Sequence, residues 1–133
     1  MSATELVADL ATRARTAART LSTATGAERK AALEAIAAAI ESRSAEILAV
    51  NEADMVNARA ENMHPQMQDR LLLTAERIKA IAAGAREVAA LPDPLGQILR
   101  KSTLPNGLEL EQISVPFGVI GMVYEARPNV TVD

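Results

Sequence analysis

Residues 115–133 read VPFGVIGMVYEARPNVTVD. From Phe117 to Tyr124 the residues are apolar, interrupted only by two glycines, and no polar residue alternates with them. This pattern is typical of a strand that is buried on both faces of a parallel sheet. Such a sheet needs further strands and a crossover connection. We therefore expect residues 116–124 to form the first strand of a larger sheet, and the chain to be the front part of a longer protein.

The sequence before residue 97 predicts helices. Ser2 and Thr25 each precede a glutamate by three residues, which is the spacing of a capping box, and apolar residues follow both at helical intervals. The second of these helical stripes is expected to bend or break at residues 41–44. The last stripe before residue 91 consists of Ile78, Ile81, Ala85, Val88 and Ala89.

Further helix starts are predicted at three places. Asn51 offers a cap to a third helix, Pro65 suits the first position of a short one, and Thr74 can cap the next. That last helix should end at LPDPLG, residues 91–96, because proline cannot continue a helix. The one histidine, His64, directly precedes a proline, and we interpret it as a loop residue and not as a catalytic base.

A β-hairpin is predicted at residues 97–115. Two candidate strands, residues 97–104 and 108–115, flank a Pro-Asn-Gly sequence whose last two residues tolerate the positive φ angles of tight turns. The alternation of apolar residues slips between Leu110 and Ile113, which indicates a bulge or a change of facing midway along the second strand.

Composition restricts the chemistry that is open to this chain. Its 133 residues include no cysteine, so a disulfide, a thiolate metal site and a cysteine nucleophile are excluded from it. The net charge of −3 gives no electrostatic signature of nucleic-acid or membrane binding, and we interpret three arginines of the first helix, Arg13, Arg15 and Arg19, as a solvated face. No metal site is predicted. No targeting or membrane-spanning segment is evident, so a cytoplasmic location is expected.

Several motifs together resemble one family. They are DRLLLT at residues 69–74, LPDP at 91–94, PNGL at 105–108, PFGVIG at 116–121 and YEARPNVTVD at 124–133. In this order they are similar to the N-terminal portion of gamma-glutamyl phosphate reductase, also called glutamate-5-semialdehyde dehydrogenase, a family of the aldehyde dehydrogenase superfamily.

The resemblance implies an α/β fold of the aldehyde dehydrogenase type in the parent enzyme. This portion would then be mainly helical, with one β-hairpin and the first buried strand of the nucleotide-binding sheet. Residues 1–96 would be the helical part of the dinucleotide-binding domain. Residues 97–115 would be the hairpin of an oligomerisation element that builds a homo-oligomer, and residues 116–133 would hold the first strand and a cofactor loop.

The resemblance also implies an activity and site residues. The family reduces L-glutamate 5-phosphate with NADPH to the semialdehyde and releases phosphate, in the second step of proline biosynthesis. Its nucleophile is a cysteine, so this chain by itself is expected to be inactive. Asn129 is a candidate oxyanion donor, although without the family Pro128-Asn129 reads as a turn and helix start. Arg127 is a candidate for binding the anionic substrate, and Arg70 is a weaker one. The candidate cofactor-binding residues are Val123, Tyr124, Glu125 and Ala126.

A second interpretation does not involve catalysis. A helical domain with a hairpin can act as an interaction module that pairs with intact subunits through the free edge of residues 97–104. The reductase interpretation predicts a natural product much heavier than 14.1 kDa with a cysteine downstream, whereas the module predicts a stable natural product of that mass.

Overall fold

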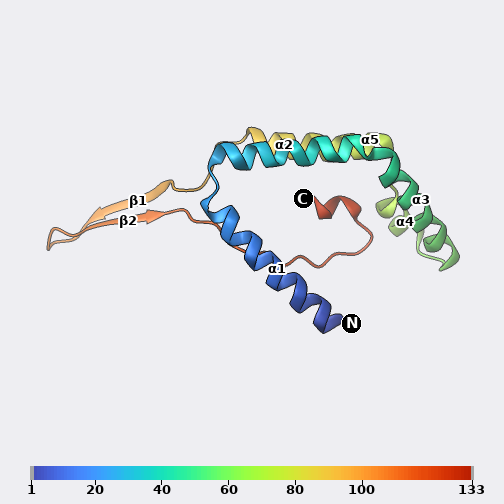
Figure 1. The fold of residues 1–133 in the computed structure, drawn as a ribbon, viewed down its shortest axis with the longest axis horizontal. Helices are drawn as coiled ribbons and strands as arrows, with labels where there is room; N and C mark the ends of the chain where they lie inside the picture. The colour runs from blue at the N-terminus through green and yellow to red at the C-terminus, as the bar shows by residue number, and fades with distance from the viewer. Residues whose placement is uncertain (1, 133) are drawn as a thin grey trace. The chain divides into compact units, whose positions relative to one another are not determined.

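The computed structural model describes residues 2–132, and these form five α-helices, a two-stranded antiparallel hairpin and a short 3₁₀ helix (Figure 1). The chain divides into two compact units. The first contains residues 2–29 and 92–121, and the second contains residues 30–91 and 122–132. A mainly helical chain with one hairpin agrees with the expectation from the sequence.

Two helices begin at the capping boxes that the sequence predicts. In α1 (Ala3–Thr23) the Ser2 hydroxyl accepts the Glu5 N–H at 3.2 Å, and the Glu5 carboxylate accepts the Ser2 N–H at 2.7 Å. Thr25 and Glu28 make the same two bonds at the start of α2 (Gly26–Ser42). These backbone N–H donors lower the pKa of both glutamates. The predicted helix starts are confirmed, although the apolar side chains of α1 stay exposed.

The linker before the hairpin is tied to the first turn of α2. The Arg29 guanidinium pairs with the Asp93 carboxylate and also donates to the Ala24 carbonyl. A Cβ atom at Gly26 would lie 2.5 Å from the same carboxylate, so a larger residue there would displace it. The Leu95 N–H and Arg29 lower the pKa of Asp93. This junction holds the linker before the hairpin against the first turn of α2.

The hairpin consists of β1 (Ile98–Thr103) and β2 (Glu109–Ile113), as predicted. Gly107 has a φ of +86°, which glycine adopts without steric cost. The predicted bulge exists, but it is on the other strand: the register passes from Ile98↔Ile113 to Arg100↔Gln112, so the extra residue is in β1. Across Glu109–Ile113 the pairing of β2 is uninterrupted, so Leu110 and Ile113, three residues apart, face opposite sides of the ribbon.

The prediction of a buried strand at residues 116–124 is wrong for this chain. The segment has no regular secondary structure, and its side chains are open to solvent, with Phe117 94% and Val123 102% exposed. A strand needs a neighbour to accept and donate its backbone hydrogen bonds. The described residues supply none here, so the apolar composition alone does not produce a strand.

The second unit is a small helical assembly with a core of short side chains. It contains the rest of α2, together with α3 (Ser44–Ala60), α4 (Pro65–Leu71) and α5 (Ala75–Ala90). The break between α2 and α3 falls at Arg43, as predicted. Ala37 of α2 and Ala82 of α5 are 0% exposed, and their small size lets the two helices pack closely (Figure 1). Ile40 and Val132 pack against this cluster.

Asn51 does not cap a helix, and this prediction is wrong. It lies inside α3, is 4% exposed, and donates to the Leu71 carbonyl at 2.9 Å while accepting the Leu73 N–H at 2.7 Å. A side-chain amide can satisfy one acceptor and one donor at once. Asn51 therefore supplies hydrogen-bond partners for backbone groups at the end of α4 and in the turn before α5, where no helix provides them.

We expect Asn51→Leu to lower the free energy of unfolding by roughly 1–3 kcal/mol, because leucine leaves the Leu71 carbonyl and the Leu73 N–H without this partner. Urea unfolding followed by circular dichroism measures the change. Asn57→Leu is the matched control, since Asn57 is exposed on the same helix. Equal effects of the two substitutions would contradict this role of Asn51.

An ion pair joins the two helices of the core. Arg86 of α5 places two guanidinium nitrogens 2.7 and 2.6 Å from the carboxylate oxygens of Glu41 on α2, and lies 3.5 Å from Glu34. The hydrogen bonds from Arg86 hold the pKa of Glu41 below its ordinary value of 4.5. A depressed folded-state pKa means that the folded protein binds fewer protons than the unfolded one.

The stabilisation from Glu41 is therefore present above its ordinary pKa of 4.5 and is lost as the pH falls through the lower folded-state pKa. We expect the urea midpoint of the wild type to approach that of Glu41→Gln as the pH is lowered from about 6 to about 3. Glu87→Gln, on an exposed position of α5, is the charge-matched control. A constant difference between wild type and Glu41→Gln across this range would refute the coupling.

Candidate functional site

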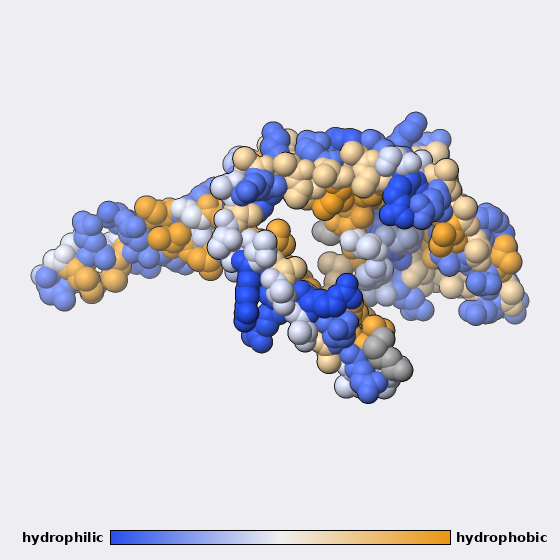
Figure 2. All heavy atoms as spheres, viewed as in Figure 1, coloured by the Kyte–Doolittle hydropathy of each residue, from blue (hydrophilic) through white to orange (hydrophobic). Residues whose placement is uncertain are grey.

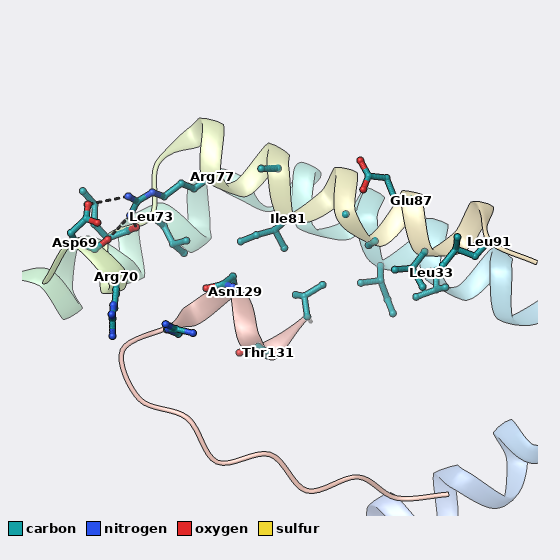
Figure 3. A pocket seen from close by; sticks show the side chains of 18 residues that line it. Leu33, Asp69, Arg70, Leu73, Arg77, Ile81, Glu87, Leu91, Asn129 and Thr131 are labelled. Carbon is teal, nitrogen blue, oxygen red and sulfur yellow. Dashed lines mark hydrogen bonds and ion pairs between the residues drawn. The ribbon is translucent and has the colours of Figure 1, made fainter. Parts of the chain in front are cut away.

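A groove of about 1100 Å³ lies in the second unit (Figure 3). Its walls come from α2, the end of α4 and the turn after it, one side of α5, and the 3₁₀ helix η1 (Pro128–Thr131) with the residue before it. Figure 2 shows apolar surface gathered beneath α2 and α5. The apolar lining includes Leu33, Ile36, Ile81, Val88 and Leu91. A largely apolar hollow with a few polar groups is the usual form of a small-molecule site.

Three of the predicted site residues come together at this groove. Arg70, Arg127 and Asn129 all line it, although almost sixty positions separate the first from the other two. In Figure 3, Asn129 lies on η1 across from Ile81 of α5. The fold thus brings the candidate anion-binding and oxyanion residues into one place.

Of the three arginines at the groove, Arg77 forms an ion pair with a carboxylate of the described residues and the two candidates do not. Within residues 2–132, no carboxylate forms an ion pair with Arg70 or Arg127, and both are exposed. Arg77 pairs with Asp69 at 3.0 Å and donates to the Leu72 carbonyl at 2.7 Å. Asp69 thus pairs with Arg77, in the first turn of α5, and not with Arg70, its neighbour in the sequence.

The segment that carries Asn129 is anchored at one end. Pro128 occupies the first turn of η1, so the turn and helix start expected from the residues alone is present. The Val132 side chain packs against the alanine cluster, and its N–H donates to the Asn129 carbonyl at 2.9 Å. Asn129 itself is partly buried. Its position therefore depends on both the local helix and the core beneath it.

The predicted cofactor-binding residues do not line the groove. Val123 is fully exposed, Tyr124 is 46% exposed, and Glu125 is exposed as well. Ala126, with a φ of +50°, is only partly buried. A role of these four residues in binding a cofactor stays a prediction.

Two residues at the groove went unnoticed in the sequence. Thr131 contacts the hydroxyl of Tyr124 at 2.6 Å, and no pattern in the sequence indicated this. Arg77 could have been inferred from its place three residues after the cap Thr74, since its N–H is the one that the Thr74 hydroxyl accepts. His64 directly precedes α4 and caps it, accepting the Gln66 N–H at 3.4 Å.

Two features are absent from residues 2–132. No group of three or more histidine, aspartate or glutamate side chains in residues 2–132 is arranged to hold a metal ion. None of the helices in that range has the length and apolar character needed to cross a membrane.

Comparisons with known proteins identify relatives of this chain. No protein-family model matches it. It is 54% identical over 123 residues to the gamma-glutamyl phosphate reductase of Geobacillus thermodenitrificans, covering 92% of this chain and 30% of that protein. It is 52% identical over 129 residues to the enzyme of the same name from Kineococcus radiotolerans, covering 97% and 30%.

A solved structure agrees with these relatives. The crystal structure of gamma-glutamyl phosphate reductase from Thermotoga maritima matches with a TM-score of 0.86 and 36% identity, over 92% of this chain and 30% of that one. Identities of 36–54% over more than nine-tenths of the chain show that it is homologous to part of a reductase. The reductases concerned are the gamma-glutamyl phosphate reductases, and the resemblance seen in the motifs is confirmed. The chain spans about 30% of the length of these relatives.

Proposed function

We propose that this chain is the N-terminal portion of an enzyme that reduces L-glutamate 5-phosphate with NADPH to L-glutamate 5-semialdehyde, releasing phosphate, in the second step of proline biosynthesis. The observation that carries the proposal is the 54% identity over 92% of the chain to a reductase of that name. A cytoplasmic location and an aldehyde dehydrogenase type of fold for the complete enzyme belong to the same proposal.

The groove supports a role in holding the substrate. Glutamate 5-phosphate carries a phosphate and a carboxylate, and a guanidinium can donate two parallel hydrogen bonds to either. Arg127 and Arg70 line the groove without a carboxylate partner in the described residues. The amide of Asn129 is a donor of the kind that stabilises a developing oxyanion. In this proposal these side chains bind the substrate and orient it.

The covalent and redox parts of the reaction lie outside this chain. It contains no cysteine, so the thiolate that would displace phosphate from the acyl phosphate is proposed for the remainder of the enzyme. The hydride donor that we propose is NADPH, and residues 123–126 would contribute at most one edge of its site. We expect the 133-residue chain alone to show no reductase activity.

The test of the proposed function uses the complete gene product. Oxidation of NADPH dependent on glutamate 5-phosphate is expected for the wild type, and Arg127→Gln should raise the KM for that substrate about ten- to a hundredfold, because a charge-assisted hydrogen bond is lost. Arg15→Gln, on the exposed face of α1, is the control that removes the same charge elsewhere. A wild-type protein without this activity would refute the proposed reaction, and an unchanged KM would refute the role of Arg127.

We further propose that the hairpin takes part in a homo-oligomer. β1 and β2 pair only with each other among the described residues, and every residue of β2 is exposed, so each strand has an edge that can bond to another chain. The division into a helical part at residues 1–96, an oligomerisation hairpin at 97–115 and a cofactor segment at 116–133 is part of this proposal. The interaction module is the alternative, and a natural product of 14.1 kDa would favour it.

A further inference from the structure

One hydrogen bond closes the segment that carries the candidate substrate-binding residue Arg127 and the candidate oxyanion donor Asn129. The Tyr124 hydroxyl lies 2.6 Å from the Thr131 hydroxyl, and either group can be the donor. The residues between them include Arg127 and Asn129, which line the groove. The bond therefore joins the two ends of a loop that presents both side chains.

The backbone of this loop has little support of its own. The helix η1 has only four residues, with bonds from the Val130 N–H to Arg127 at 3.1 Å and from the Val132 N–H to Asn129 at 2.9 Å. Ala126 has a φ of +50°, a left-handed conformation that residues with a Cβ atom adopt only at a cost. Short 3₁₀ helices have poor hydrogen-bond geometry, so the loop conformation must be held by contacts outside its backbone.

The two ends of the loop are anchored very unequally. On the far side Val132 packs against the alanine cluster of the core. On the near side Met122 is 57% exposed and Val123 is fully exposed, so neither side chain fixes the chain. The bond from Tyr124 to Thr131 is the described interaction that ties the loose end to the anchored one.

We propose that Tyr124 and Thr131 are positioning residues, whose hydrogen bond fixes the loop that holds Arg127 and Asn129 at the groove. This inference rests on the proposed function and refines it. Tyr124, which the resemblance names as a cofactor-binding candidate, has in this proposal the further role of holding the loop that carries Arg127 and Asn129. In this proposal Thr131 acts through Arg127 and Asn129.

The test compares Thr131→Val, which keeps the shape and removes the hydroxyl, with Thr131→Ser, which keeps the hydroxyl. In the complete reductase, run in reverse with the semialdehyde, NADP⁺ and inorganic phosphate, Thr131→Val is expected to raise the KM for phosphate and to lower kcat by roughly three- to tenfold each, the range of one hydrogen bond. Thr131→Ser should restore both. Thr103→Val, on the exposed strand β1, is the control.

The KM separates positioning from simple loss of folded protein, because fewer folded molecules lower the apparent kcat without changing the KM. Unchanged kinetics in Thr131→Val, or failure of Thr131→Ser to restore the KM, would overturn the inference.

A second readout does not depend on activity. The 133-residue chain has one tyrosine and no tryptophan, so its tyrosine fluorescence reports on Tyr124 alone. The anisotropy should fall in Thr131→Val and remain at the wild-type value in Thr131→Ser. If the complete wild-type protein shows no reductase activity, the proposed function fails, and this measurement still decides whether the bond holds the loop: equal anisotropy in the two variants would overturn it.

Discussion

Replacing Ile78 by alanine is expected to lower the free energy of unfolding by about 2–5 kcal/mol, the range for large-to-small changes at buried aliphatic positions. Ile78 is 1% exposed and is the largest fully buried side chain of the described residues. The other buried apolar side chains are those of five alanines and Met55: Ala37, Ala58, Ala82, Ala85 and Ala89. A core of such small groups buries little area per residue, so one isoleucine supplies a large share of it.

Urea unfolding of the chain, with the helical signal as the probe, measures this change. Val88→Ala on the same helix is the matched control, because Val88 is 55% exposed and its truncation leaves no cavity. If Ile78→Ala does not fold, Ile78→Val removes a single methylene and should cost about 0.5–1.5 kcal/mol. Equal stability of wild type and Ile78→Val would show that this position is not part of the core.

The second large effect is expected at Asn129 in the complete reductase. Asn129→Ala should lower kcat by about a hundred- to a thousandfold with a small change in KM, since an oxyanion donor acts mainly in the transition state. Asn129 is partly buried on η1 and lines the groove. Steady-state kinetics with glutamate 5-phosphate measure the loss.

Two further variants separate catalysis from a structural role. Asn129→Asp keeps the shape and the acceptor oxygen but loses the amide donor, so it should be as impaired as alanine if the donor matters. Asn57→Ala, at an exposed position of α3, should match the wild type. A near wild-type kcat in Asn129→Asp would show that the Asn129 amide is no oxyanion donor and that the residue only contributes to the turn after Pro128.

The site was only partly predictable from the sequence. Family motifs pointed to Arg70, Arg127 and Asn129, and the fold brings these three to one groove. The same resemblance named residues 123–126 as cofactor-binding candidates; they lie outside the groove, and their role stays a prediction. Thr131 went unnoticed because a hydroxyl contact across seven positions leaves no trace in local spacing.

The sequence by itself determined the ends of helices and the hairpin turn. The capping boxes at Ser2 and Thr25, the cap at Thr74 and the glycine of the Pro-Asn-Gly turn act within three or four residues of the chain. Short-range hydrogen bonds and steric limits on φ are properties of a few neighbouring residues, so they can be read without knowing the rest of the fold.

Only the tertiary structure decided which distant groups satisfy one another. Asn51, a cap by its local sequence, became a buried bridge because the chain after α4 lies against α3. Asp69 pairs with Arg77 and not with the adjacent Arg70, because Arg77 at the start of α5 reaches both the carboxylate and the carbonyl of Asp69. Residues 116–124 stayed without regular structure because no strand lies beside them in the described chain. In each case the deciding partner is remote in sequence, and a pattern along the chain cannot show whether that partner is in place.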